Sequence, residues 1–300
     1  MIGFAHTTPQ KLDRLIFFAS YEKRCLQVAR EMSDSHVDNP VLVFYCADIS
    51  SPERDDNLAE ISGLFPGRVT QVPVSYKGPT KMIEFAGKLK WPGSTLVDVS
   101  CFNRANLFSF LWASRLGLGV EPELTLSYSE PESYGTWLTA DYKRADNFIG
   151  FGGEVEFAAN RHLICLLGLE GDRALEIINS VEPSSLTIVV GTTKPRAEQI
   201  SRNRESFWRE LGTMDHDIRI IDVKNPAACL VGLQEIVNEL PKETSIHIAP
   251  LSTKPSCLAA YGLWLQNRAI RLWNAQPETY NLLDYSKGMK PGRYYRARWQ

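Results

Sequence analysis

Residues 15–32 read LIFFASYEKRCLQVAREM, an apolar run followed by a charged segment and then by a stretch with helical periodicity. A short run of β-branched and aromatic residues is typical of a buried strand, and apolar residues spaced three and four apart are typical of a helix. The same order recurs at residues 163–181, LICLLGLEGDRALEIINSV. The chain therefore contains two strand-to-helix segments of one kind.

Ten such strands are predicted, five in each half of the chain. Those of the first half begin near residues 15, 41, 69, 94 and 123, and those of the second half near residues 163, 186, 217, 245 and 269. Helical stretches lie between them, and strands separated by helical crossovers pair in parallel. The predicted fold class is α/β, with two tandem Rossmann-like units, each a mostly parallel five-stranded sheet flanked by helices.

Three matched pairs of residues indicate an internal duplication. They follow the first, fourth and fifth strands of each half, and are Arg24 with Arg173, Arg104 with Lys254, and Pro131 with Pro277. Their offsets are 149, 150 and 146 residues, a near-constant period. The sequence therefore predicts a first unit at residues 1–148 and a second at residues 149–300, with a basic aromatic tail at its end.

The charges of the chain nearly balance. Its 300 residues include 33 Lys and Arg against 35 Asp and Glu, a formal net charge of -2. This balance excludes a globally basic nucleic-acid-binding protein. No apolar run reaches the roughly 18 residues of a membrane span, and the N-terminus lacks the apolar core of a signal peptide. We expect a cytoplasmic protein without membrane contact.

The spacing of the cysteines and the lack of the usual enzyme motifs predict that the chain holds no cofactor and no metal. The six cysteines are widely spread, mostly in apolar runs, with no CxxC pair and no histidine at ligand spacing. In a cytosolic protein this pattern favours reduced core cysteines over a disulfide or zinc site. The chain also lacks GxGxxG after a strand, a P-loop, HExxH and GxSxG.

Polar segments follow the strands at the places where ligands bind. In open parallel α/β sheets that place lies beyond the carboxyl ends of the strands. Helix N-termini there favour anions, and an Arg or Lys in the same loop adds a full charge. The four matched cations are thus predicted to face one anionic ligand or two related sites, although each is also compatible with an ordinary surface cation. The candidate ligand-binding residues are Tyr21, Arg24, Ser100, Asn103, Arg104, Tyr134, Glu170, Arg173, Thr253, Lys254, Glu278 and Tyr280.

A Pro-Glu-Ser/Thr-Tyr turn follows the fifth strand in each half, at residues 131–134 and 277–280. Its carboxylate suits a ribose hydroxyl and its ring suits stacking on a base. The turn is equally compatible with an ordinary corner in which Tyr packs and Glu caps the next helix. If the chain is an enzyme, the candidate acids or bases are Glu22, Asp98 and Glu132.

The last fourteen residues, 287–300, read KGMKPGRYYRARWQ and depart from the repeat. Five basic residues with three aromatics between them are compatible with single-stranded nucleic acid, through phosphate contact and base stacking. Alternatively, the aromatics pack on the protein while the charges stay solvated. We favour packing, because Tyr294, Tyr295 and Trp299 carry a large apolar area.

In architecture the chain resembles the CRISPR-associated Rossmann-fold (CARF) sensors and the related fused two-unit (SAVED-like) sensors of bacterial antiphage defence. The resemblance runs through both repeats, in FASYEKR, DVSCFNR, GLEGDR, PLSTKP and PETYN. It implies two Rossmann-like units, related by a pseudo-twofold axis, that close on a nucleotide or oligonucleotide signal. No effector nuclease is evident in the sequence, so the resemblance implies a separately encoded protein partner.

These observations favour a protein that binds a phosphorylated nucleotide-type ligand in the crevice between its repeats, as the sensing or accessory component of a multi-protein bacterial system. The first alternative is a hydrolase or transferase that acts on a nucleotide or glycosidic bond in the same crevice. The second is a non-catalytic protein–protein adaptor. A strongly raised carboxylate pKa in the crevice would favour the enzyme, and an exposed apolar patch would favour the adaptor.

Overall fold

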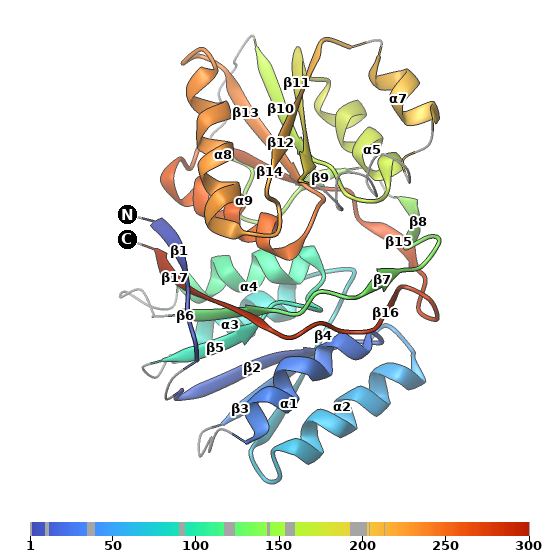
Figure 1. Cartoon of the computed structure of the whole chain (residues 1–300), viewed down its shortest axis with the longest axis vertical. Helices are drawn as coiled ribbons and strands as arrows, with labels where there is room; N and C mark the ends of the chain where they lie inside the picture. The colour runs from blue at the N-terminus through green and yellow to red at the C-terminus, as the bar shows by residue number, and fades with distance from the viewer. Residues whose placement is uncertain are drawn as a thin grey trace. The chain divides into compact units, whose positions relative to one another are not determined.

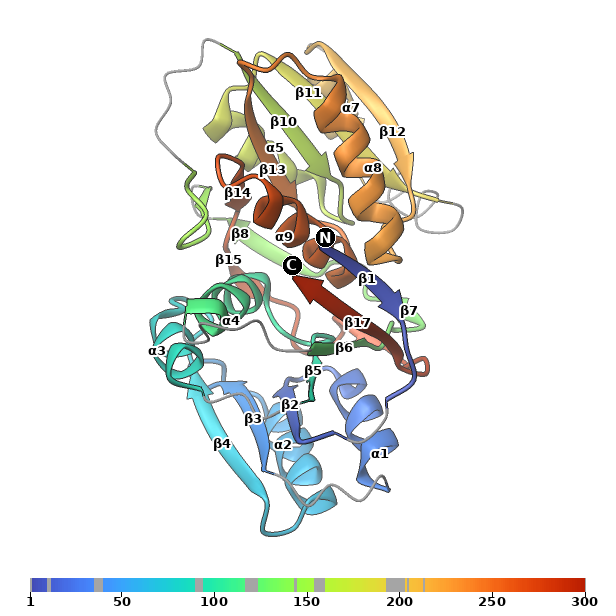
Figure 2. The same cartoon turned by 90° about the vertical axis from the view of Figure 1, so that its left-hand side faces the viewer.

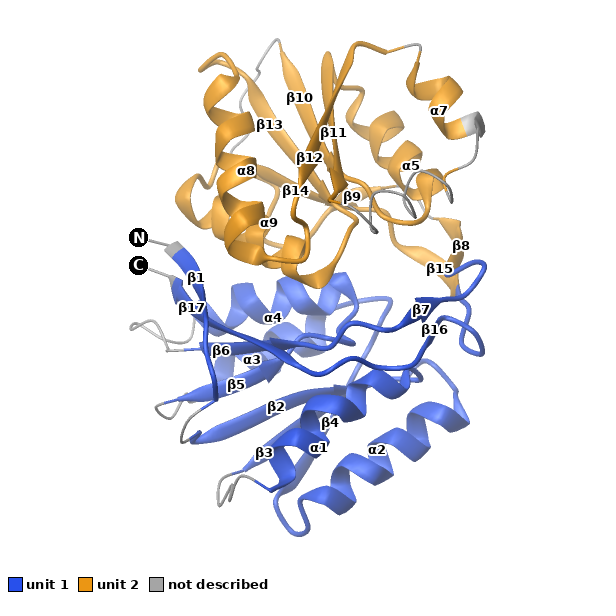
Figure 3. Cartoon of the chain, viewed as in Figure 1, with its two compact units in different colours: residues 1–138, 280–300 blue, residues 139–279 orange. Residues whose placement is uncertain are grey.

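The computed structural model describes residues 2–9, 12–34, 40–89, 94–116, 124–142, 145–153, 160–192, 203, 205–212 and 214–299. The chain forms two compact units (Figure 3). Unit 1 consists of Met1–Leu138 and Tyr280–Gln300, and unit 2 consists of Thr139–Thr279. The chain therefore leaves unit 1 once and returns to it at its C-terminal end.

Unit 1 is built on a seven-stranded sheet with the order β1-β17-β6-β5-β2-β3-β4 (Figure 1). Strands β2 to β6 pair in parallel. The middle strands β2 and β5 are buried along almost their whole length, as expected for strands covered on both faces. The bounds of the five strands are β2 Arg14–Ala19, β3 Val41–Cys46, β4 Val69–Val74, β5 Thr95–Asp98 and β6 Leu124–Tyr128.

Helices cover both faces of this sheet in pairs (Figures 1 and 2). On one face lie α1 (Gln27–Ser33) and α2 (Pro52–Leu64), which contact each other. On the other lie α3 (Thr80–Lys88) and α4 (Arg104–Leu116). A short 3-10 helix, η1 (Lys23–Leu26), connects β2 to α1. Each helix thus buries one face against the sheet and sets the loop before it at the carboxyl end of a strand.

Unit 2 repeats this arrangement on a six-stranded sheet with the order β12-β11-β10-β13-β14-β9. Helices α5 (Gly171–Val181) and α7 (Glu205–Leu211) lie on one face, and α8 (Pro226–Glu239) and α9 (Lys254–Gln266) lie on the other (Figure 1). The bounds of the strands are β9 Asp146–Asn147, β10 Arg161–Leu166, β11 Ser185–Gly191, β12 His216–Ile221, β13 Ser245–Pro250 and β14 Arg271–Asn274.

The parallel strands have the same order in the two units. Along the sheets they run β4-β3-β2-β5-β6 in unit 1 and β12-β11-β10-β13-β14 in unit 2. The predicted α/β fold of two tandem Rossmann-like units is therefore confirmed, and each predicted strand is found. The sheets exceed five strands because antiparallel strands extend one edge of each, β1 and β17 in unit 1 and β9 in unit 2.

The C-terminal segment belongs to unit 1, which differs from the predicted second unit at residues 149–300. Strand β17 (Arg293–Trp299) lies between β1 (Ile2–His6) and β6 and pairs antiparallel with both. Tyr295 is 2% exposed, so this residue of the tail is packed as expected, but in unit 1 and not in the second unit. Pairing with strands far away in the sequence leaves no local pattern, which is why the tail is misplaced from sequence alone. The side chain of Trp299 lies outside the described part of the structure.

The first crossing between the units also comes earlier than the predicted boundary at residue 148. Asn147 in β9 pairs with Trp273 in β14, and the fully buried Phe151 packs against Trp264 of α9. This stretch is therefore part of unit 2. Two short ladders flank the crossings, β7 (Ser133–Tyr134) with β16 (Ser286–Lys287), and β8 (Thr139–Tyr142) with β15 (Pro277–Tyr280).

All six cysteines are buried, which confirms their predicted positions in the core, and none forms a disulfide in the structure. Among the helices that the structure describes, none is long and apolar enough to cross a membrane.

Candidate functional site

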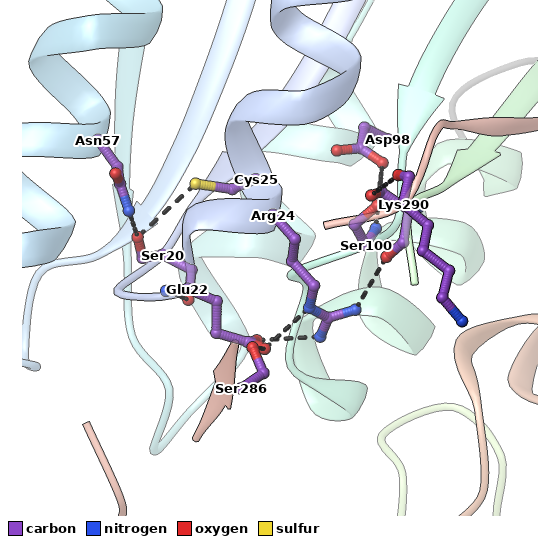
Figure 4. A network of polar contacts seen from close by, with 10 residues as sticks. Ser20, Glu22, Arg24, Cys25, Asn57, Asp98, Ser100, Ser286 and Lys290 are labelled. Atoms are coloured by element: carbon purple, nitrogen blue, oxygen red, sulfur yellow. Dashed lines mark hydrogen bonds and ion pairs between the residues drawn. The ribbon is translucent and has the colours of Figure 1, made fainter. Parts of the chain in front are cut away.

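Polar side chains at the carboxyl end of the unit 1 sheet form a connected hydrogen-bonded network (Figure 4). They come from the segments directly after β2, β5 and β6, from α2, and from the C-terminal segment. The members are Ser20, Glu22, Arg24, Asn57, Asp98, Ser100, Ser129 and Ser286, together with Lys290, whose backbone carbonyl oxygen accepts from the hydroxyl of Ser129. Because this end of the sheet is where open α/β folds bind ligands, the network and the loops around it form the candidate site of unit 1.

A buried ion pair lies at the centre of the network. Nε of Arg24 donates to Oε2 of Glu22 at 2.8 Å, and Nη2 of Arg24 donates to Oε1 at 3.0 Å. The two side chains are 4% and 6% exposed. Burial lowers the pKa of Arg24, but the adjacent Glu22 carboxylate outweighs it and holds the pKa well above its ordinary value. The Arg24 guanidinium therefore stays charged inside the protein.

The two matched arginines have the same structural role in their units. Nη1 of Arg24 donates to the carbonyl oxygen of Ser129, just after β6, at 3.3 Å. Nε of Arg173 donates to the carbonyl oxygen of Ala275, just after β14, at 2.7 Å, and its Nη2 donates to Asn274. Each arginine joins the first helical segment of its unit to the end of the fifth parallel strand. Both buried guanidinium groups are thus held by protein acceptors, and contact with a ligand stays a prediction for these two residues.

The other two matched cations have a different environment. Arg104 begins α4 after the N-cap Asn103, whose Oδ1 accepts a backbone N–H of the first turn at 2.8 Å. Lys254 begins α9 after the N-cap Thr253, which likewise accepts a first-turn N–H. Both cations are half-exposed. A cation is mildly unfavourable at the positive end of the helix dipole, and a nearby acceptor on the protein or an anionic ligand offsets this effect.

Asp98 and Ser100 lie deeper in the unit 1 network. Oδ1 of Asp98 accepts hydrogen bonds from the hydroxyl of Ser100 at 2.5 Å, from its backbone N–H at 3.2 Å, and from Ser127 at 3.3 Å. The hydroxyl of Ser100 in turn accepts from the backbone N–H of Ser129 at 2.8 Å. Burial raises the pKa of Asp98 to about 6, against these hydrogen bonds, which lower it. The site thus contains a carboxyl group that titrates close to neutral pH.

Asp98→Asn is expected to change how stability depends on pH. Because the pKa of Asp98 is about 6 in the folded chain, against about 3.9 for an unfolded Asp, the folded state holds more protons between these values. The free energy of unfolding of the wild type therefore falls as pH rises through this window. The free energy of unfolding of Asp98→Asn, relative to that of the wild type, should therefore rise by up to about 3 kcal/mol between pH ~4 and ~7. Urea unfolding at several pH values measures this difference. Asp215→Asn, on an exposed side chain, is the control; equal pH profiles of wild type and Asp98→Asn would contradict the expectation.

Four tyrosines form a row at the same end of unit 1. The rings of Tyr21 and Tyr285 lie 5.8 Å apart, those of Tyr285 and Tyr280 lie 6.4 Å apart, and those of Tyr280 and Tyr76 lie 5.6 Å apart. Tyr76 is buried, whereas the other three are half-exposed. Partly exposed aromatic rings offer faces on which nucleobases stack.

The remaining candidates do not gather in one place. Glu170 accepts hydrogen bonds from the hydroxyl and the backbone N–H of Thr139, within unit 2. Glu132 and Glu278 are exposed, and Tyr134, in β7, is half-buried. Of the three candidate acids or bases, Glu22 and Asp98 join the network and Glu132 does not. A single ligand that meets both units stays a prediction of the sequence.

Sequence reasoning missed several members of the site. Ser129 and Ser286 join the network, and Tyr76 and Tyr285 complete the tyrosine row. Ser129 and Tyr76 had a usable signal, since Ser129 ends a predicted strand and Tyr76 directly follows one. Ser286 had none, because it meets Glu22 only through the return of the chain to unit 1.

Comparison with solved structures finds a match that covers most of this chain. A type III CRISPR defence DNA nuclease activated by cyclic oligoadenylate matches with a TM-score of 0.55 at 8% identity, over 86% of this chain and 65% of that chain. The chain therefore spans about two thirds of the length of the nuclease. At this identity the likeness shows the fold alone, and the predicted architectural resemblance to antiphage defence sensors is confirmed at that level.

Two reductases match more weakly. Isoflavone reductase has a TM-score of 0.28 at 10% identity, over 86% of this chain and 89% of that chain. Leucoanthocyanidin reductase with NADPH from Vitis vinifera has a TM-score of 0.28 at 9% identity, over 92% of each chain. Such low scores support no conclusion about this chain. No protein-family model and no curated protein sequence matches it.

Proposed function

We propose that the chain binds a phosphorylated nucleotide-type ligand at the carboxyl ends of its strands, as the sensing or accessory component of a multi-protein antiphage defence system. The observation that carries the proposal is the fold match, over 86% of the chain, to a nuclease activated by cyclic oligoadenylate. A cyclic oligoadenylate is therefore the first ligand to test. A separately encoded effector, as the sequence predicts, would respond to the bound state.

The positions of Arg104 and Lys254 support an anionic ligand. Each begins a helix of 13 residues and is half-exposed. The backbone N–H groups of a helix N-terminus and its dipole favour phosphate, and a cationic side chain at the same place adds a charge-assisted hydrogen bond. A phosphate would also offset the unfavourable interaction between the cation and the dipole.

The tyrosine row supports a ligand that carries a base. Tyr280 and Tyr285 are half-exposed and lie at the same end of the unit 1 sheet as the start of α4. Base stacking on aromatic side chains contributes about 1 to 3 kcal/mol per base. Unit 1 alone therefore offers groups suited to both parts of a nucleotide, the phosphate and the base.

The pKa of Asp98 favours a hydrolase or transferase as the second candidate. A carboxyl group with a pKa of about 6 is suited to general acid–base catalysis. However, Asp98 is 1% exposed, and one of its oxygens already accepts from Ser100 and Ser127. A ligand would reach this carboxylate only after these contacts opened, so we prefer binding over catalysis.

The fate of the nucleotide distinguishes the two candidates. The purified chain is incubated with a cyclic oligoadenylate, and the protein-bound and free nucleotides are then analysed by liquid chromatography and mass spectrometry. A sensor retains the nucleotide intact with the protein, whereas a hydrolase yields linear products that disappear in Asp98→Asn. Retention of the intact nucleotide supports the proposal. Cleavage to linear products, or a protein that neither retains nor cleaves the nucleotide, contradicts it for this class of ligand.

A further inference from the structure

The outer edge of the unit 2 sheet exposes two large apolar side chains. Strand β12 is the last strand of this sheet (Figure 2) and, within the described part of the chain, pairs with β11 and no other strand. Ile218 and Ile220 are 48% and 50% exposed. An edge strand with unpaired backbone groups and apolar side chains is a template for a further strand.

The duplication identifies the equivalent positions in unit 1. One cross-strand row runs through Phe17, Val43 and Gln71 in unit 1, and another runs through Cys165, Ile188 and Ile218 in unit 2. In both rows the first two residues belong to the hydrophobic core between the sheet and the helices of one face, which are α1 and α2 in unit 1 and α5 and α7 in unit 2. Gln71 is therefore the counterpart of Ile218, and Pro73, two residues further, is the counterpart of Ile220.

The two units have different residue types at this edge of the sheet. In unit 1 the exposed positions hold Gln71 and Pro73. A polar side chain removes the apolar surface, and a proline lacks the N–H that a neighbouring strand would accept, so both protect an edge against pairing. Unit 2 has isoleucine at both positions. The same fold thus carries one protected edge and one edge that is suited to pairing.

We propose that β12 pairs antiparallel with β12 of a second copy of this chain, about a twofold axis at Ile218. A twofold interface uses the same surface on both copies and must be self-complementary. With the axis at Ile218, the residue opposite Asp217 is Arg219 of the other copy, and the reverse. Opposite charges directly across an antiparallel pair are stabilising.

The charges select this register over its neighbours. An axis at Asp217 would place two aspartates opposite each other, and an axis at Arg219 would place two arginines opposite each other, both destabilising. Asp217 and Arg219 are 54% and 42% exposed, so a second copy can reach them; within one chain Arg219 pairs with both Asp217 and Glu239. At the chosen axis the two Ile218 side chains meet on the apolar face. The interface rests on unit 2 alone and is independent of the proposed ligand.

Sedimentation velocity over a concentration series tests the dimer. The wild type is expected to show a concentration-dependent monomer–dimer equilibrium, since a six-residue strand pair is small for a permanent interface. Ile218→Lys should weaken dimerisation at least about tenfold, with an unchanged melting temperature because the side chain is exposed. Gln71→Lys, at the equivalent position of the protected edge, should have no effect. A wild type that stays monomeric at every concentration, or equal effects of the two lysines, would overturn the proposal.

A cysteine scan tests the register. At a twofold axis, residue 218 faces its own copy, with Cα atoms roughly 4.5 to 5.5 Å apart in an antiparallel pair, which a disulfide spans. Mild oxidation of Ile218→Cys should give a disulfide-linked dimer, whereas Ile220→Cys should not, because residue 220 faces residue 216 of the other copy. Gln71→Cys is the matched control for random collision. Equal cross-linking of all three variants would disprove this register.

Discussion

Arg24→Met is expected to lower the free energy of unfolding by about 3 to 5 kcal/mol, measured by urea unfolding at neutral pH. The substitution leaves the Glu22 carboxylate buried without its counter-ion, while the hydroxyl of Ser286 still donates to it. Breaking one partner of a buried pair costs far more than the net contribution of the pair, because the remaining charge is desolvated.

A double variant separates this effect from lost packing. Glu22→Gln combined with Arg24→Met removes both charges and should restore most of the lost stability, since a neutral buried pair carries no desolvated charge. Arg30→Met is the exposed control, because Arg30 pairs with Glu60 at the surface, with 48% and 41% of the side chains exposed. It should cost less than about 1 kcal/mol. A similarly small cost for Arg24→Met would show that the buried pair does not hold the first helical segment to the end of β6.

The strands of the fold could be predicted because each is a local property of the sequence. Runs such as residues 15–19 and 163–166 are buried on both faces and therefore almost continuously apolar, with helical periodicity directly after them. The constant spacing of Arg24 with Arg173 and of Arg104 with Lys254 then indicated the duplication. By contrast, β1 and β17 pair across nearly the whole chain, and the sequence gives no local sign of such a pairing.

The candidate site could be predicted only in part, because the sequence shows which residues follow a strand but not which way they turn. All four matched cations follow strands, yet Arg24 and Arg173 turn inward to carbonyl groups of their own units. Arg104 and Lys254 sit at helix starts and are half-exposed. The inward turn of Arg24 depends on the Glu22 carboxylate two residues earlier, a charge pairing that the sequence offers but does not prove.

Replacing both Arg104 and Lys254 by Ala is expected to weaken binding of a phosphorylated nucleotide by about 1.5 to 3 kcal/mol for each cation that contacts it. Each substitution removes one charge-assisted hydrogen bond to phosphate. The melting temperature should change little, because both side chains are half-exposed. Arg115→Ala, at the exposed end of α4, is the matched control and should bind like the wild type. A large loss of stability in the double variant would instead show Arg104 and Lys254 to be structural cations.

The most direct measurement of the proposed function is isothermal titration of the purified wild-type chain with cyclic oligoadenylates of different ring sizes, repeated with the Arg104→Ala, Lys254→Ala double variant. We expect saturable binding of at least one ring size to the wild type. That binding should weaken as salt is raised, because phosphate contacts are electrostatic, and it should be lost in the double variant while its melting temperature is retained. A folded wild type that binds none of them, or a double variant that binds as tightly as the wild type, would contradict the account.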